Sequence, residues 1–74
     1  MKTVKNLKSI PSYLRTSVNQ IMEFLESSEP YLFKKFSSIE IFSLWDRYSS
    51  EIYEAGFIDV NENSLSYFVT WVYE

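Results

Sequence analysis

The sequence predicts a small all-α protein, a bundle of three or four helices packed around the third. Apolar side chains recur at helical spacing along the chain, and two of the helical stretches follow residues that commonly cap helix N-termini. We expect residues 1–10 to form a basic N-terminal arm and residues 11–74 to form a single helical domain. The expected helices lie at about residues 11–27, 30–36, 38–55 and 62–73.

Prolines mark the first two helices. Pro11 follows Ser9, and proline is tolerated in the first turn of a helix because an N–H there would have no partner. Pro30 follows Glu29 and predicts a short helix that depends on packing for its stability. The apolar residues of the first helix fall on one face, as helical spacing requires; they are Leu14, Val18, Ile21, Met22 and Leu25.

The third helix has a clear start signal. Ser37 and Glu40 have the spacing of a capping box, in which each side chain accepts a hydrogen bond from the backbone of the other. The apolar side chains of this helix cover about half of its circumference, more than the stripe of about 100° that a surface helix needs. It should therefore be the central helix, with helices on both sides or with one edge reserved for another molecule. Gly56 is expected to take the left-handed conformation that commonly ends a helix.

Two folds compete for the C-terminal segment. A β-hairpin from residue 57 would pair FIDV with LSYFVTWVY across NENS, because the second run is rich in β-branched and aromatic residues. A turn followed by a helix would use Asn61 as the N-cap, with Val60 and Leu65 at the positions of a hydrophobic staple. We favour the helix and keep the hairpin as the alternative.

A calcium loop is a third interpretation of the same stretch. Asp59, Asn61 and Asn63 match the first three ligand positions of an EF-hand. However, Ser64 stands where the loop needs glycine, and Thr70 stands where it needs a bidentate glutamate. Asp and Asn at alternate positions are typical of turns and caps, so we expect no calcium site.

The composition excludes most kinds of catalytic chemistry. The chain has no cysteine and no histidine, so it lacks the ligands of ordinary zinc, haem and iron–sulfur sites and the usual general base. A single glycine leaves no Gly-rich phosphate loop. We therefore expect no enzymatic activity, no cofactor, no metal and no small-molecule substrate. No apolar stretch is long enough for a membrane span and no signal peptide is visible, so we expect a cytoplasmic protein.

Charge is unevenly distributed along the chain. Residues 1–22 contain Lys2, Lys5, Lys8 and Arg15 and no acid, whereas Arg47 is the only basic residue from position 36 onward. The basic arm, with Lys2, Lys5 and Lys8 as contact residues, supports an alternative function as a small helix-turn-helix-like DNA-binding regulator. The expected recognition helix has no cation to neutralise phosphate, which counts against that function.

The aromatic content predicts a docking surface. Six phenylalanines, six tyrosines and two tryptophans are more rings than a chain of 74 residues can enclose. On the third helix, Phe42, Asp46, Ser49 and Tyr53 form a ridge at helical spacing, mixing aromatic anchors with a charge. We expect Phe42, Asp46 and Tyr53 to contact a partner protein. A homodimer that buries the excess rings is a further alternative, as in a self-associating structural protein.

Acidic residues offer a second contact surface. Glu51, Glu54, Asp59 and Glu62 lie on the third helix or soon after it. A dense acidic face can occupy the basic groove of a nucleic-acid-handling protein in place of phosphates. The partner expected for these residues is therefore a protein with such a groove.

One pattern in the sequence resembles a known group of proteins. Trp45-x-x-Tyr48-Ser49, followed by Ala55-Gly56-Phe57, is similar to short uncharacterised proteins of bacterial viruses and mobile elements. Small size, acidity and the absence of catalytic residues are also similar to viral proteins that disarm host defence enzymes by binding them. We therefore expect a non-enzymatic protein-binding module, encoded by a virus or mobile element, that inhibits a host protein in the host cytoplasm.

Overall fold

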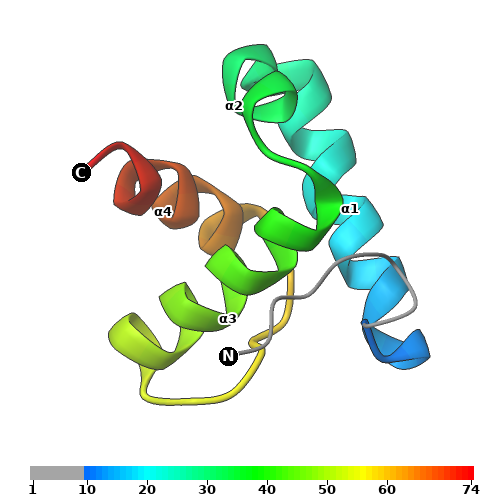
Figure 1. The fold of residues 1–74 in the computed structure, drawn as a ribbon. Helices are drawn as coiled ribbons and strands as arrows, with labels where there is room; N and C mark the ends of the chain where they lie inside the picture. Colours follow the sequence, from blue (N-terminus) through cyan, green and yellow to red (C-terminus); the bar gives the residue numbers. More distant parts are fainter. Residues whose placement is uncertain (1–9) are drawn as a thin grey trace.

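The computed structural model describes residues 10–74 and has four helices (Figure 1). They are α1 (Ser12–Ser28), α2 (Pro30–Lys35), α3 (Ser38–Tyr53) and α4 (Glu62–Tyr73). The expected all-α fold is confirmed. No strand occurs between residues 10 and 74, so the alternative of a C-terminal β-hairpin is wrong. The candidate DNA contacts Lys2, Lys5 and Lys8 lie outside the described residues.

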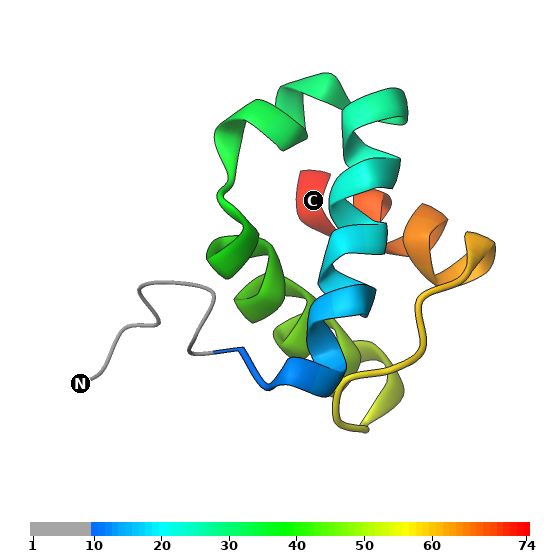
Figure 2. The same cartoon turned by 90° about the vertical axis from the view of Figure 1, so that its right-hand side faces the viewer.

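Helices α1 and α2 form one side of the fold. Pro11 is the N-cap of α1 and makes no side-chain cap, although its carbonyl accepts a 2.9 Å hydrogen bond from the Leu14 amide. Glu29 separates the two helices, and Pro30 opens α2 as expected. Figure 2 shows α2 at the end of the molecule where α1 and α3 are joined.

Helix α3 lies between α1 and α4 (Figure 1). The Ser37 amide donates to Glu40 Oε1 at 2.9 Å, and the Glu40 amide donates to Ser37 Oγ at 3.3 Å, which confirms the capping box. The capping box could be predicted because Ser37 and Glu40 are only three residues apart in the sequence. The buried face of α3 carries Ile41, Trp45, Tyr48 and Ser49.

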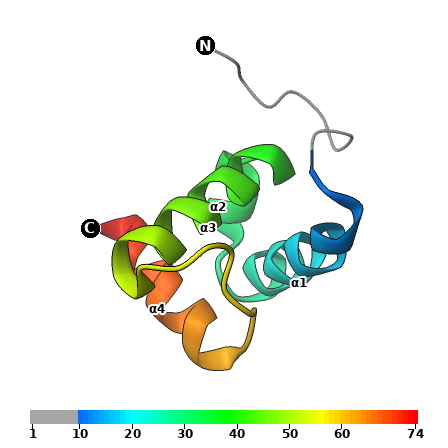
Figure 3. The same cartoon turned by 90° about the horizontal axis from the view of Figure 1, so that it is seen from below.

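The end of α3 differs from the prediction. The helix stops at Tyr53, and Glu54, not Gly56, takes the left-handed conformation (φ 53°, ψ 42°). The reason is tertiary, because the following segment turns back and is held by α3. The Ile58 amide donates to Ser49 Oγ at 3.1 Å, and Trp45 Nε1 donates to the Ile58 carbonyl at 3.0 Å. Figure 3 shows this connection running back toward α1 before α4 begins.

Helix α4 begins as the capping signal predicts. Asn61 Oδ1 accepts from the Ser64 amide at 3.0 Å, and Ser64 Oγ accepts from the Asn61 amide at 2.9 Å. The Ser64 carbonyl also accepts a 2.9 Å bond from the buried Tyr48 hydroxyl of α3. These local and tertiary bonds outweigh the β propensity of the residues that follow.

All four helices contribute to one hydrophobic core. At its centre, the Trp45 ring lies 4.8 Å from Phe68 and 5.2 Å from Tyr48, between ring centroids, in the tilted and edge-on geometries that aromatic pairs prefer. Every phenylalanine and tryptophan is buried or half-buried, but five of the six tyrosines are exposed. The exposed tyrosines are Tyr13, Tyr31, Tyr53, Tyr67 and Tyr73.

Candidate functional site

An exposed apolar surface lies where the end of α3 meets α4. Ile52 is 53% exposed, Tyr53 43% and Tyr67 63%. Tyr67 separates two hollows in this surface. The larger, of about 390 Å³, lies among Tyr53, Asp59 and Tyr67, and the smaller, of about 180 Å³, lies among Ile52, Tyr67 and Trp71. We call the two hollows together the α3–α4 groove.

Buried hydrogen bonds hold the groove in shape. The Tyr48 hydroxyl lies beneath it, donates to the Ser64 carbonyl, and is 3.4 Å from the Tyr53 hydroxyl. The rings of Tyr48 and Tyr53 meet edge to face with centroids 5.7 Å apart. Burial, together with the hydrogen bond to Tyr53, raises the pKa of Tyr48 well above its usual value, so the hydroxyl stays protonated near neutral pH. The exposed ring of Tyr53 is therefore pre-positioned by a buried neighbour.

The larger hollow is also shaped by the connection between α3 and α4. Ser49 Oγ donates to the Trp45 carbonyl at 2.8 Å while accepting from the Ile58 amide. At the far end of the connection, Ser64 Oγ donates to the Asp59 carbonyl at 2.9 Å. Asp59 is thus held by its backbone, and this exposed residue lines the hollow.

The ridge expected on α3 is not a continuous surface. Ser49 is fully buried, and Phe42 is half-buried and stacked on Phe57 with ring centroids 5.7 Å apart. Asp46 and Tyr53 are exposed. The connection after α3 folds back over the ridge, where Phe57 packs on Phe42 and the Ile58 amide bonds to Ser49. Of the three aromatic and charged residues expected there, Tyr53 alone borders the groove.

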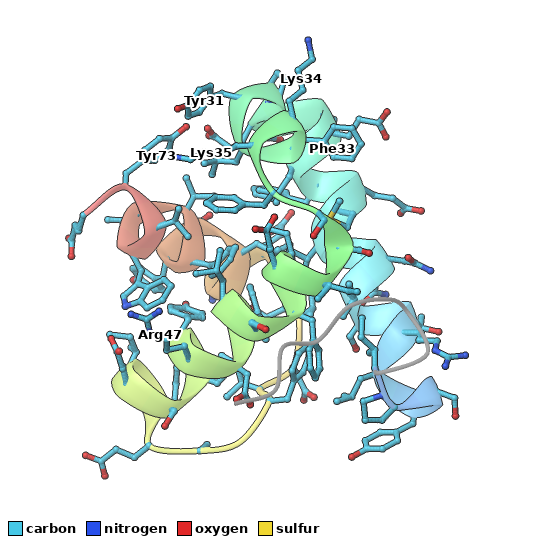
Figure 4. All side chains as sticks on the ribbon, viewed as in Figure 1. Tyr31, Phe33, Lys34, Lys35, Arg47 and Tyr73 are labelled. Carbon is cyan, nitrogen blue, oxygen red and sulfur yellow. The ribbon has the colours of Figure 1, made fainter. Side chains whose placement is uncertain are left out.

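The expected acidic residues are all exposed, but they have different surroundings. Glu51 accepts a 3.2 Å bond from Trp71 Nε1 and forms a 3.5 Å ion pair with Arg47, whose guanidinium lies 6.0 Å from the Trp71 ring centroid. Figure 4 shows Arg47 reaching from α3 toward α4. Asp59 lines the larger hollow and Glu74 the smaller. Glu54 and Glu62 flank the connection that carries Asp59.

Among residues 10–74, no lysine or arginine lines the groove to offset these acids. Arg47 is the last lysine or arginine in the chain, and it is engaged with Glu51 and Trp71. In the part of the chain that the structure describes, the Asp59 carboxylate has no ion-pair partner. The groove therefore combines apolar walls with uncompensated negative charge.

Ile52 and Tyr67 are the groove residues that were not singled out from the sequence. Ile52 belongs to the wide apolar arc of α3, and only the position of α4 decides which part of that arc stays uncovered. Tyr67 lies on α4 next to the buried Phe68 and points away from the core. The width of the arc was the one signal of an uncovered edge.

A second cluster of exposed rings lies outside the groove, between α2 and the C-terminal end of α4. Figure 4 shows Tyr31, Lys35 and Tyr73 together where α2 meets the end of α4. The Lys35 ammonium lies 5.6 Å from the Tyr31 ring centroid, and the Tyr73 hydroxyl donates to Glu29 Oε1 at 3.1 Å. These tyrosines already have intramolecular partners, so this cluster is a weaker candidate than the groove.

The stretch considered as a calcium loop serves a structural purpose. The Asn61 side chain caps α4, and among residues 10–74 no group of three or more acidic side chains is placed to hold a metal ion. Nor does any helix of this region have the length and apolarity needed to cross a membrane. Comparisons with protein-family models, curated proteins and solved structures found no match.

Proposed function

We propose that this protein is a non-enzymatic protein-binding module and that the α3–α4 groove is its docking surface. The observation that carries the proposal is the exposure of Ile52, Tyr53 and Tyr67 together on one groove. Exposed tyrosines surrounding apolar hollows are typical of interface hot spots, because a rigid ring gives a large contact area at a low cost in entropy. The hydrogen bonds under Tyr53 reduce that cost further.

The proposal extends to inhibition of a host protein by a protein of a virus or mobile element. Support for inhibition comes from the acids around the groove, which suit a partner with a basic surface. Support for the source is the sequence resemblance described above. The residues that carry it include Trp45, Tyr48 and Ser49, which are buried here and therefore have packing functions of their own.

The DNA-binding alternative has less support. Residues 54–61 separate α3 from α4, and this eight-residue connection is longer than the three or four residues of a helix-turn-helix. The groove is acidic, and α4 contains no lysine or arginine to contact phosphate. A gel shift on duplex DNA at low and high salt tests this alternative. Binding that disappears with Lys2, Lys5 and Lys8 changed to Gln would favour it.

The proposed function is tested with matched baits in bacterial lysate. Tyr67→Ser removes a groove ring, and Tyr13→Ser removes a ring that is 79% exposed on α1, outside the groove. We expect wild type and Tyr13→Ser to retain the same protein and Tyr67→Ser to lose it. The retained protein is then purified and its affinity for each bait is measured by calorimetry.

One result would refute the proposal, because equal affinity of all three baits would show that the groove is not the docking surface. Circular dichroism checks that Tyr67→Ser keeps its helices. If it does not, Ile52→Ser, which removes another exposed apolar side chain of the groove, takes its place in the same comparison. Light scattering at micromolar concentration separates a monomeric binding module from the homodimer alternative.

A further inference from the structure

We infer that the α3–α4 groove binds an arginine side chain of the partner protein in its larger hollow, with a neighbouring apolar side chain of the partner in its smaller hollow. This inference rests on the proposed function and specifies the chemistry of the partner. It depends on how Tyr53, Asp59 and Tyr67 lie around the larger hollow.

The larger hollow has the groups that a guanidinium needs. Arginine combines a planar cation, which stacks on aromatic rings, with fixed N–H donors that match a carboxylate. Tyr53 and Tyr67 supply exposed rings, and Asp59 supplies the one charged side chain on the wall. Asn63 also lines this hollow, and an asparagine side chain has a carbonyl acceptor that a guanidinium can use. Lysine has no plane to stack and would satisfy only part of this environment.

The protein already uses this chemistry at the edge of the groove. The guanidinium of Arg47 lies 6.0 Å from the Trp71 ring centroid, and its Nε is 3.5 Å from the Glu51 carboxylate. In this internal arrangement one cation, Arg47, contacts one ring, Trp71, and one carboxylate, Glu51. The larger hollow is lined by the same two kinds of group, an aromatic ring and an acidic residue, and no lysine or arginine of residues 10–74 lines it.

The smaller hollow suits an apolar side chain. Its walls include Ile52, Tyr67 and Trp71, and its volume is about 180 Å³. Glu74 stands at this hollow and Asp59 at the other. Since Tyr67 borders both hollows, an arginine and an adjacent apolar residue of the partner would lie on the two sides of its ring.

Charge argues against a second copy of this chain as the occupant. A two-fold contact through the groove would bring its own carboxylates, Asp59 and Glu74, close to those of the other copy, and no cation of the groove would separate them. A partner that presents arginine replaces this repulsion with attraction.

The test uses nuclear magnetic resonance with three synthetic peptides. The probes are blocked alanine-based helical peptides with one leucine and, one turn away, one arginine, one lysine or one citrulline, which is uncharged and has nearly the shape of arginine. We expect the arginine peptide to shift the amide signals of Tyr53, Asp59 and Tyr67. Its affinity should exceed that of the citrulline peptide by about tenfold, as expected for one charge-assisted hydrogen bond, and the lysine peptide should be intermediate.

Asp59→Asn is the matched variant of the protein. It keeps the backbone carbonyl that accepts from Ser64 and removes only the negative charge. The variant should lose about tenfold in affinity for the arginine peptide and show no change for the citrulline peptide. Asp46→Asn, which is exposed on α3 and does not line the groove, should bind the arginine peptide as wild type does.

Several results would overturn the inference. Equal affinity for the arginine and citrulline peptides, or no effect of Asp59→Asn, would show that the groove does not bind a guanidinium group. Groove signals that change with protein concentration alone would identify a second copy as the occupant. Stronger peptide binding after Lys2, Lys5 and Lys8 are changed to Gln would identify the chain's own N-terminal segment. A cellular partner that is lost with Tyr67→Ser and kept with Asp59→Asn would leave the proposed function standing and refute only the arginine site.

Discussion

Moving the glycine after α3 from position 56 to position 54 should stabilise the protein. Glu54 has φ 53° and ψ 42°, a left-handed conformation that costs an ordinary L-residue about 1–2 kcal/mol. Glu54→Gly removes this cost and also removes a negative charge from a helix C-terminus, which contributes about 0.3 kcal/mol or more at an exposed site. The greater freedom of glycine in the unfolded chain offsets about 0.4–1 kcal/mol. The net gain is about 1 kcal/mol.

Gly56→Ala should add to this gain. Gly56 does not have a positive φ, and a Cβ built on it meets no atom within 4 Å. Alanine fits there without strain and restricts the unfolded chain, which stabilises by about 0.4–1 kcal/mol. Because the two positions are two residues apart, the double variant is compared with both single variants, which measures any coupling between them.

The assay is unfolding by urea and by heat, followed by circular dichroism at 222 nm. For a domain of this size, 1 kcal/mol raises Tm by about 4–8 °C. Ala55→Gly is the control, because Ala55 does not have a positive φ and glycine there should destabilise. If Glu54→Gly lowers the free energy of unfolding and Gly56→Ala lowers it by more than about 1 kcal/mol, then Gly56 is the left-handed residue and the description of the α3 terminus is wrong.

Three further predictions concern the groove and its support. Tyr48→Phe removes the 2.9 Å hydrogen bond to the Ser64 carbonyl and should cost about 0.5–1.5 kcal/mol in urea unfolding. The pKa of Tyr48 in the folded protein is raised above 10.0, so its contribution to the free energy of unfolding is complete below about pH 10 and is lost as pH rises further. Tyr48→Phe should therefore make the free energy of unfolding fall less steeply above about pH 10. An unchanged slope would contradict the pKa shift. Ser49→Ala removes the acceptor of the Ile58 amide and the donor to the Trp45 carbonyl, and should lower the free energy of unfolding by about 1–3 kcal/mol. The control Ser50→Ala, at an exposed position, should change it by less than about 0.5 kcal/mol. Ile52→Ser should cost less than about 1 kcal/mol, since the side chain is 53% exposed; a cost of 2 kcal/mol or more would show that Ile52 is part of the packing and not of a free surface.

The helices could be predicted because their signals are local. Ser37 with Glu40, and Asn61 with Ser64, are capping pairs three residues apart, and both are present. Residues at such short spacing meet in any helix that begins there, whatever the rest of the chain does. The same holds for the apolar faces, which follow from helical periodicity.

The connection between α3 and α4 could not be predicted in the same way. Its path depends on Trp45 and Ser49 bonding to Ile58, which is thirteen and nine residues away, respectively. Helical spacing placed Ser49 on a ridge with Phe42 and Tyr53, but spacing does not show which part of a ridge another segment covers. The groove has the same limitation, since it exists only because α4 leaves Ile52 uncovered and adds Tyr67.

The exposed tyrosines alone do not establish a docking surface. A tyrosine hydroxyl is hydrated at the protein surface, so exposing a tyrosine costs less free energy than exposing a phenylalanine. In this chain every phenylalanine is buried or half-buried, whereas five of the six tyrosines are exposed. Tyr13 stands apart from the groove, and Tyr73 has a partner in Glu29. Ile52 has no polar atom to hydrate, yet about half of it is exposed, in a hollow that Tyr67 and the buried Tyr48 also line. The groove differs from the rest of the surface because it brings together an exposed aliphatic side chain, Ile52, two tyrosine rings and the acidic residue Asp59.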